Sequence, residues 1–280
     1  MKGPHDDESR HEVVRTRGGA LAMRSLSDGE VMHPGVGPLV EAELLYVRQS
    51  RLAERLRSFK GVSGRDSLVV FDVGLGAGSN AIAARAESER APVESARLEL
   101  ISFERDLGAL KLALNEPAAF GLDGEMGVAA RRLLETGAHE TARTRWQLRH
   151  GELLTSLETE SARADIVYWD PFSPRANPLL WTVAAFSAIR QCANSHCTLF
   201  TYSASTATRV AMLLAGWAVG IGDAIGDKRQ TTAAAVSTED LSRPLDSSWL
   251  ARLARADAPL PADAPSDFAA RIARLPQFNQ

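Results

Sequence analysis

Cysteine is scarce in this chain, and its two cysteines, Cys192 and Cys197, lack the spaced set of further cysteines and histidines that a zinc site requires. We therefore expect ordinary thiols and no bound metal. Such sparing use of cysteine is typical of a reducing compartment. The charged start, His5-Asp6-Asp7-Glu8, has no apolar segment of the signal-peptide kind. No apolar run approaches the roughly 18 residues of a membrane span. These absences favour a cytoplasmic protein that does not enter a membrane.

An excess of charge of one sign is missing too. The 32 lysines and arginines stand against 35 acidic residues, which gives a net charge of −3. A broad basic surface for nucleic acid is therefore not indicated, and any such contact must come from local clusters. The candidate clusters are Arg48, Arg51, Arg55 and Arg57, then Arg143, Arg145, Arg149 and His150, and finally Lys228 with Arg229. Each cluster is equally well interpreted as a solvated face balanced by neighbouring glutamates.

What the sequence does have is a regular alternation of strand and helix patterns. Short apolar runs, which suit strands buried on both faces of a parallel sheet, occur at 67–73, 98–104, 146–149, 165–169 and 197–202. Helical patterns separate them, and residues 120–142 form a looser helical insertion. Two last runs, at 217–219 and 231–236, have no helix between them and predict an antiparallel hairpin at one edge. This order predicts an α/β fold with a doubly wound, mostly parallel, Rossmann-like sheet of about seven strands.

The domain organisation follows from the ends of this pattern. Residues 1–24 are polar, charged and glycine-containing, and we expect a flexible leader there. Residues 25–240 hold the compact α/β domain, with a helical segment at 40–56 near its start. Residues 241–280 are rich in proline and alanine and form a C-terminal extension with short amphipathic pieces. The sequence does not decide the oligomeric state.

A loop with alternate glycines, in the segment FDVGLGAGSN, follows the first buried strand. Gly74, Gly76 and Gly78 let the backbone turn sharply and approach a ligand, and the next helix presents free N–H groups. A tight turn without any ligand explains the glycines as well. The spacing differs from the dinucleotide pattern G-x-G-x-x-G, and no G-K-[ST] follows. A dehydrogenase is therefore the least favoured interpretation, and a P-loop is excluded.

Acidic residues stand at the carboxyl ends of three successive predicted strands. Asp72 lies at the end of the first, Glu104 ends the second, and Glu152 follows the third. Ligands of open α/β sheets bind at this edge, where a carboxylate can accept two hydrogen bonds from ribose hydroxyls. Glu104 and Glu152 also have an alternative role as favourable charges at a helix start. The three acids together indicate a ligand site more strongly than each does alone.

A stiff loop with the sequence DPFSPRANPLLW, residues 170–181, follows the fourth strand. Its three prolines fix φ and remove backbone donors, so regular structure is not expected there. Yet the loop opens with Asp170 and carries Phe172. On spacing alone, aspartate before proline is a common turn opening. The predicted strand order places this segment, which we call the signature loop, beside the glycine loop.

These segments resemble one family in particular, the methyltransferase domain of the tRNA 5-methylaminomethyl-2-thiouridine biosynthesis protein and its stand-alone relatives. The likeness covers roughly residues 29–236 and rests on the ordered segments EAELLYVRQSRLAERL, FDVGLGAGSN, ISFERD, DPFSPRANPLLW, TYSASTATRVAMLLAGW and GDKRQTTAA. The glycine loop is general to class I S-adenosylmethionine-dependent methyltransferases, whereas the signature loop is specific to this family.

The resemblance implies methyl transfer from S-adenosylmethionine to the exocyclic amine of 5-aminomethyl-2-thiouridine at the tRNA wobble position. It implies that the cofactor contacts Asp72, Gly74, Gly76, Gly78, Asn80, Glu104, Glu152 and Asp170. Asp170 is the candidate for orienting the amine and accepting its proton, and Phe172 for stacking on the uridine or walling the pocket. The further substrate contacts are Asn177, Lys228 and Arg229, and the partner is the anticodon region of tRNA.

The sequence departs from the family in three respects. Glu152 stands where the family usually has aspartate, which weakens the implied adenine contact, and Arg175 replaces the usual lysine. Only about 45 residues follow Val236, too few for the flavin-dependent domain of the best-known members, so we expect no flavin in this chain. Two alternatives stay open: a methyltransferase acting on another amine or small metabolite, and an aminopropyltransferase-like enzyme. A non-enzymatic binding module is disfavoured by the intact acids.

Overall fold

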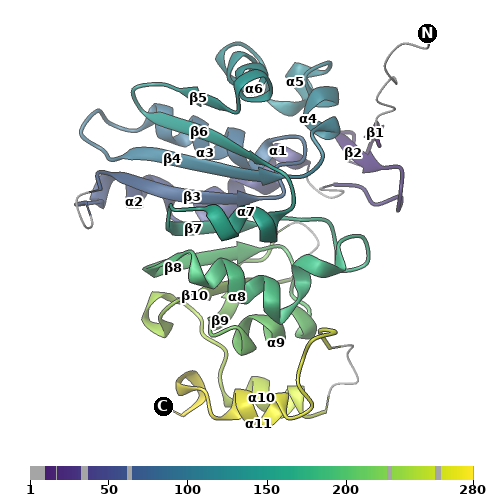
Figure 1. Cartoon of the computed structure of the whole chain (residues 1–280), viewed down its shortest axis with the longest axis vertical. Helices are drawn as coiled ribbons and strands as arrows, with labels where there is room; N and C mark the ends of the chain where they lie inside the picture. Colours follow the sequence, from purple (N-terminus) through teal and green to yellow (C-terminus); the bar gives the residue numbers. More distant parts are fainter. Residues whose placement is uncertain are drawn as a thin grey trace.

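The computed structural model describes residues 10–16, 18–32, 37–61, 65–225, 229–255 and 260–279. Within them, one large sheet has the strand order β5-β6-β4-β3-β7-β8-β10-β9, with helices on both faces (Figure 1). Its strands are β3 (Ser67–Val73), β4 (Arg97–Glu104), β5 (Ala138–Glu140), β6 (Thr144–His150), β7 (Ala164–Trp169), β8 (Ala193–Thr201), β9 (Ala218–Gly222) and β10 (Thr231–Ala235). The predicted α/β fold with a mainly parallel sheet is confirmed.

The central strands are parallel and buried on both faces. Strand β3 pairs in parallel with β4 and β7, while β6 and β8 extend the sheet on either side. Alternate side chains of β3 enter different cores: Leu68 and Val70 pack on one face, and Val69 and Phe71 on the other. Because these strands run the same way, the loops that follow them meet at one edge of the sheet.

The helices divide between these two faces. One face is covered by η1 (Ala42–Arg48, a π-helix), α2 (Leu52–Ser58), α3 (Ser79–Arg90) and α6 (Glu125–Thr136), and the other by α7 (Leu153–Thr159), α8 (Val183–Gln191) and α9 (Thr206–Leu214). The shorter helices are α1 (Pro38–Glu41), α4 (Gly108–Ala113) and α5 (Pro117–Phe120). None of the described helices has the length and apolar character needed to cross a bilayer.

Two predicted helices are interrupted. The segment at 40–56 contains α1, η1 and α2, and Arg51 separates the last two in the left-handed conformation (φ 56°). The helix expected after the signature loop begins as a 3₁₀ turn, η2 (Pro178–Trp181), and restarts as α8. Thr182 marks that restart, because its side chain accepts a hydrogen bond from the backbone of Ala185.

The edges of the sheet add one strand to the prediction. Strands β9 and β10 form the expected antiparallel pair, with β10 also paired to β8. At the other edge β5 pairs antiparallel with β6, inside the region that we interpreted as helical. Its three residues, AHE, carry no alternation long enough to reveal a strand. The sheet therefore has eight strands in the described residues, against the seven that the sequence predicts.

The described part of the expected leader is a packed hairpin. Strands β1 (His11–Arg15) and β2 (Leu21–Ser25) pair antiparallel beside α4 (Figure 1). Ala22 and Met23 are both 1% exposed, and Met23 joins the core under η1 and α3. Burial of these short apolar stretches stabilises the hairpin. The expectation of a flexible segment rests on the charged and glycine-containing residues around them. The expectation of a flexible leader thus needs correction for residues 10–16 and 18–24.

The C-terminal extension packs against the β9 end of the sheet. It follows η3 (Thr238–Asp240) and contains α10 (Ser247–Leu253), α11 (Phe268–Ala273) and η4 (Pro276–Phe278), and its Trp249 and Ile272 are buried in the second core. The side chain of Gln277 accepts a hydrogen bond from the Val219 amide (2.8 Å) and donates one to the Val219 carbonyl (2.6 Å). Gln277 thereby satisfies the backbone of an edge strand.

Candidate active site

A cavity of about 960 Å³ lies at the carboxyl ends of β3, β4, β6 and β7. Most of the predicted site residues line it: Gly74, Gly76, Asn80, Glu104, Glu152, Asp170, Phe172 and Asn177. Asp72 and Gly78 are not on its wall, and neither is the exposed Arg229. Lys228 lies outside the described residues. The parallel strand order thus brings together segments that are far apart in the sequence.

The first glycine of the glycine loop, Gly74, packs against the backbone of the signature loop and leaves no room there for a side chain. Gly74 has φ +88°, and a Cβ atom there would lie 2.7 Å from the carbonyl oxygen of Asp170. Gly76 has φ +52°, and its Cβ would lie 3.2 Å from the sulfur of Met32. Both backbone conformations favour glycine. The glycine loop and the signature loop therefore touch backbone to backbone, and together they form one wall of the cavity.

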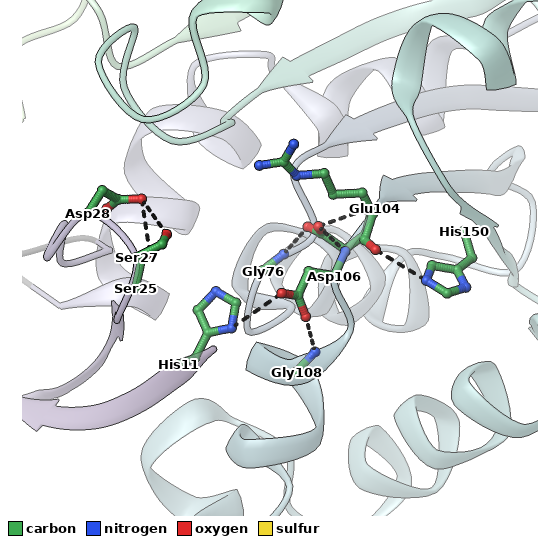
Figure 2. Close-up of polar contacts among 10 residues, drawn as sticks. His11, Ser25, Ser27, Asp28, Gly76, Glu104, Asp106, Gly108 and His150 are labelled. Carbon is green, nitrogen blue, oxygen red and sulfur yellow. Dashed lines mark hydrogen bonds and ion pairs between the residues drawn. The ribbon is translucent and has the colours of Figure 1, made fainter. Parts of the chain in front are cut away.

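Glu104 ties the glycine loop to the end of β4 (Figure 2). Its Oε2 accepts a hydrogen bond from the Gly76 amide (3.0 Å), and its Oε1 accepts from the amides of Arg105 (2.8 Å) and Asp106 (2.9 Å). Burial raises the pKa of this carboxyl above its ordinary value, although the backbone hydrogen bonds act to lower it. A carboxylate offers about four lone-pair positions. Three are used here, which leaves room for about one hydrogen bond from a ligand hydroxyl.

Asp72 stands behind the cavity wall rather than on it. The residue is fully buried, and its Oδ2 accepts a hydrogen bond from the Ser102 hydroxyl (2.7 Å), which in turn accepts one from Trp146 Nε1 (2.9 Å). Its Oδ1 has no hydrogen-bond partner among the described residues. Burial raises the pKa of Asp72 to about 7, and the nearby Asp170 and Glu104 carboxylates add to this increase. The charge of Asp72 therefore depends strongly on its surroundings.

The carboxylate of Asp170 is held from two sides. Asn80 at the start of α3 donates a hydrogen bond from Nδ2 to Oδ2 of Asp170 (2.8 Å). The backbone of Asp170 is fixed separately, because its amide donates to the Val73 carbonyl (2.9 Å). The buried Tyr46 of η1 also hydrogen-bonds this carboxylate, and burial together with Asp170 holds the pKa of Tyr46 well above its ordinary value. Tyr46 is a site residue that sequence reasoning missed. Its position within the family's EAELLYVRQ segment was the available signal.

The rest of the signature loop is held by side chains from several elements. Trp181 donates from Nε1 to the Phe172 carbonyl (2.8 Å), and Tyr202 donates to the Pro171 carbonyl (3.0 Å). The ring of Phe172 stacks on His11 of β1 with centroids 6.2 Å apart and planes inclined by 11°. His11 also contacts a second part of the cavity wall, because its Nδ1 is 4.0 Å from Oδ2 of Asp106 (Figure 2). The N-terminal hairpin therefore spans two walls of the site.

Glu152 and several arginines of the predicted basic clusters form ion pairs or hydrogen bonds within the protein. Glu152 is exposed and lies 3.5 Å from Arg105. Arg149 pairs with Glu160 (2.6 Å), and Arg51 pairs with Glu54. Arg143 donates to the carbonyls of Val93 and Ser95, and Arg55 donates to Thr198 and to the Asp165 carbonyl. Arg51 and Arg149 thus fit the interpretation of a charge balanced by a nearby glutamate, whereas Arg55 and Arg143 are held by backbone carbonyls and a hydroxyl. None of these four arginines lines the cavity.

The cavity itself is acidic. Its wall includes seven carboxylates, of Asp28, Glu30, Glu41, Glu104, Asp106, Glu152 and Asp170. Against them stand three lysine or arginine side chains, of Arg10, Arg105 and Lys111. A cavity lined by one sign of charge attracts ligands of the opposite sign. Its chemistry therefore suits a cationic ligand or substrate.

Comparison with known proteins identifies relatives of this chain. Residues 129–237 match a family described as S-adenosyl-L-methionine-dependent methyltransferase. The tRNA 5-methylaminomethyl-2-thiouridine biosynthesis bifunctional protein MnmC of Ralstonia nicotianae is 29% identical over 238 residues, which cover 82% of this chain and 34% of that protein. The protein of the same name from an Azoarcus species is 30% identical over 74% of this chain and 33% of its own length. The chain thus spans about a third of the length of the curated relatives it matches.

A solved structure extends the similarity to the whole fold. The crystal structure of MnmC2 from Aquifex aeolicus superposes with a TM-score of 0.72 and 26% sequence identity. That alignment covers 96% of this chain and 87% of the Aquifex chain. The chain therefore belongs to the S-adenosyl-L-methionine-dependent methyltransferases and is similar, over most of its length, to the methyltransferase domain of MnmC.

Proposed function

We propose that this enzyme methylates the exocyclic amine of 5-aminomethyl-2-thiouridine in the anticodon region of tRNA. The proposal takes its substrate from the MnmC relatives, of which the chain spans about a third. The observation that carries it is the acidic cavity with the Asp170 carboxylate on its wall. An alkylamine has a pKa of about 10 and arrives mostly as an ammonium ion, which such a cavity attracts.

The residues present fit S-adenosylmethionine, which supplies an electrophilic methyl group on a positive sulfonium when bound. The glycine loop exposes backbone where a side chain would fill the space, and Glu104 keeps about one acceptor position for a ribose hydroxyl. Asn80 lines the cavity, and its Oδ1 is a buried acceptor without a hydrogen-bond partner among the described residues. We assign this oxygen to the amino-acid end of the donor, with the charge of Asp72 behind it. Glu152 is assigned to the adenine side.

Asp170 is the residue to which we assign the amine. Its carboxylate binds the ammonium and accepts one of its protons, which exposes the nitrogen lone pair. The new N–C bond would form as the bond between the methyl carbon and the sulfonium sulfur breaks, with S-adenosylhomocysteine as the leaving group. Asn80 and Tyr46 keep the carboxylate in one orientation, so that the amine is placed before reaction rather than during it. Phe172 and Asn177 line the same cavity and are assigned to the uridine.

The polyanionic part of the substrate needs contacts outside the acidic cavity. Exposed basic side chains at its rim and nearby are those of Arg10, Arg105, Lys111 and Arg175, with Arg229 on the turn before β10. We assign these residues to phosphates of the anticodon arm, and binding should therefore weaken steeply with salt. Binding of a small amine would not weaken steeply with salt. The salt dependence of binding therefore distinguishes tRNA from the alternative substrate class, a small amine metabolite.

The test uses bulk tRNA from cells that lack this gene, labelled S-adenosylmethionine, and the wild-type and Asp170→Ala proteins. The proposal predicts label in one uridine-derived nucleoside with the wild-type protein. Asp170→Ala should lose at least about a hundredfold in rate while binding of S-adenosylmethionine by calorimetry is retained. Label in a small amine but not in tRNA would replace the proposed substrate. Near-normal turnover of Asp170→Ala would remove Asp170 from the mechanism.

A further inference from the structure

A pair of hydrogen bonds joins the N-terminal segment to the signature loop. The carboxylate of Glu30, which follows β2, accepts one bond from the Ser173 amide (3.0 Å) and one from the Ser173 hydroxyl (2.7 Å). The two residues are 143 positions apart in the chain. We propose that Glu30 is a positioning residue for methyl transfer, which holds the signature loop so that Asp170 and Phe172 face the reacting amine. The activity readout of this inference rests on the proposed function.

Glu30 is itself fixed by the turn that carries it. Figure 2 shows the hydrogen bonds that the Asp28 carboxylate of this turn accepts from Ser25 and Ser27. Its amide donates to Oδ1 of Asp28 (2.9 Å), and its carbonyl accepts from the Ser25 amide (2.9 Å). Oδ2 of Asp28 accepts from the hydroxyls of Ser25 (2.9 Å) and Ser27 (3.0 Å). Although burial opposes it, these hydrogen bonds lower the pKa of Asp28. A side chain that springs from such a turn has little freedom, so its carboxylate can fix the loop that it contacts.

The same segment contacts the signature loop on both sides of Ser173. Before it, Phe172 stacks on His11 of β1. After it, Arg175 donates a hydrogen bond to the Asp28 carbonyl (3.2 Å). Asp170 lies three positions before Ser173 and is separated from it by Pro171, whose ring fixes φ. A shift at Ser173 is therefore transmitted to Phe172 and Asp170, and a misplacement of about 1 Å can cost about a hundredfold in rate.

Three variants distinguish positioning from direct binding of the cationic substrate. Glu30→Ala removes both hydrogen bonds. Glu30→Gln removes only the charge, because the amide oxygen can accept from the Ser173 amide while the amide nitrogen donates to the hydroxyl. The matched control is Glu12→Ala on the hairpin that precedes Glu30, which removes a half-exposed ion pair between Glu12 and Arg24 (3.0 Å).

We expect Glu30→Ala to lower kcat by about ten- to a hundredfold, with the Kd of S-adenosylmethionine changed less than about twofold. Glu30→Gln should recover to within about threefold of wild type, and Glu12→Ala should match wild type. A normal kcat in Glu30→Ala would overturn the inference. So would an equal loss in Glu30→Gln, because that result would assign the effect to charge.

Hydrogen exchange provides a readout that needs no substrate. The Ser173 amide should exchange faster in Glu30→Ala than in wild type, and Glu30→Gln should restore its protection. A failure of the wild-type protein to methylate tRNA would then count against the proposed function alone. Unchanged exchange at Ser173 in a folded Glu30→Ala protein would count against the positioning role, whatever the substrate is.

Discussion

Replacing Gly74 by alanine tests whether the glycine loop and the signature loop form one rigid wall. Two effects add at this position. A side chain at φ +88° costs about 1–2 kcal/mol of folding free energy. The new Cβ would also lie 2.7 Å from the carbonyl oxygen and 2.9 Å from the carbonyl carbon of Asp170, which are backbone atoms that cannot rotate away. Overpacking of that kind costs about 1–3 kcal/mol. We therefore expect Gly74→Ala to lose about 2–5 kcal/mol in total.

Gly137 provides the matched control for this variant. It ends α6 at φ +77°, and a Cβ there would meet no heavy atom within 4 Å. Gly137→Ala therefore carries the conformational strain without the clash and should lose only about 1–2 kcal/mol. The free energies of unfolding of both variants are measured in urea. If the m-values agree, the loss in Gly74→Ala should exceed that in Gly137→Ala by about 1–3 kcal/mol, which is the cost of the clash with the Asp170 backbone. Equal losses in the two variants would refute the backbone contact between the loops.

Three further predictions concern single side chains. Because burial raises the pKa of Asp72 from 3.8 to about 7, the folded protein keeps a proton here that the unfolded chain releases, so this group's stabilisation is present at acid pH and lost as the pH rises to about 7. Asp72→Asn should remove that slope and raise the free energy of unfolding at pH 8 but not at pH 4, as followed by urea denaturation. Tyr46→Phe should lower kcat by about tenfold while leaving the Kd of S-adenosylmethionine unchanged, since the hydroxyl that it removes hydrogen-bonds the Asp170 carboxylate and the Trp169 carbonyl (3.4 Å); a tighter or weaker Kd would argue for a cofactor role. Gln277→Ala should speed hydrogen exchange at the Val219 amide and lower the free energy of unfolding by about 1–2 kcal/mol, and unchanged exchange would contradict the edge role of Gln277.

The parts of the fold that the sequence predicts are those set by local pattern. Strand β3 is a continuous apolar run, and β4 and β7 repeat that signal, so the parallel sheet and its order of elements could be expected. Parallel strands carry their following loops to one edge, which is why Gly74, Glu104 and Asp170 could be assigned to one site from the sequence. The three residues do line the same cavity.

The parts that could not be predicted depend on contacts between distant segments. Nothing in the composition near Met23 distinguishes a packed hairpin from a loose leader, since only the core under η1 and α3 makes its burial favourable. Strand β5 has only three residues, which is too few for an alternation of apolar and polar residues to predict a strand. The hydrogen bond between Glu30 and Ser173 joins residues 143 positions apart, and no local signal announces it.

The acids also divide their roles in a way that spacing alone does not reveal. Asp72 is a buried residue near the end of β3, and its carboxylate accepts a hydrogen bond from Ser102 on the neighbouring strand. It therefore lies behind the cavity rather than on its wall. The Glu104 carboxylate accepts three hydrogen bonds from backbone amides, including that of Gly76. Sequence position fixes which strand end an acid occupies, but the tertiary hydrogen bonds decide what remains for a ligand.

The methyl acceptor that we propose is a primary amine on a wobble uridine. The most direct measurement offers wild-type protein and S-adenosylmethionine two otherwise identical anticodon stem–loops, one with 5-aminomethyl-2-thiouridine and one with unmodified uridine at the wobble position. Mass spectrometry of the digested nucleosides then locates the methyl group. We expect one added methyl on the exocyclic nitrogen of the first substrate and none on the second. Methylation of both, or of neither while S-adenosylmethionine binds normally, would contradict it.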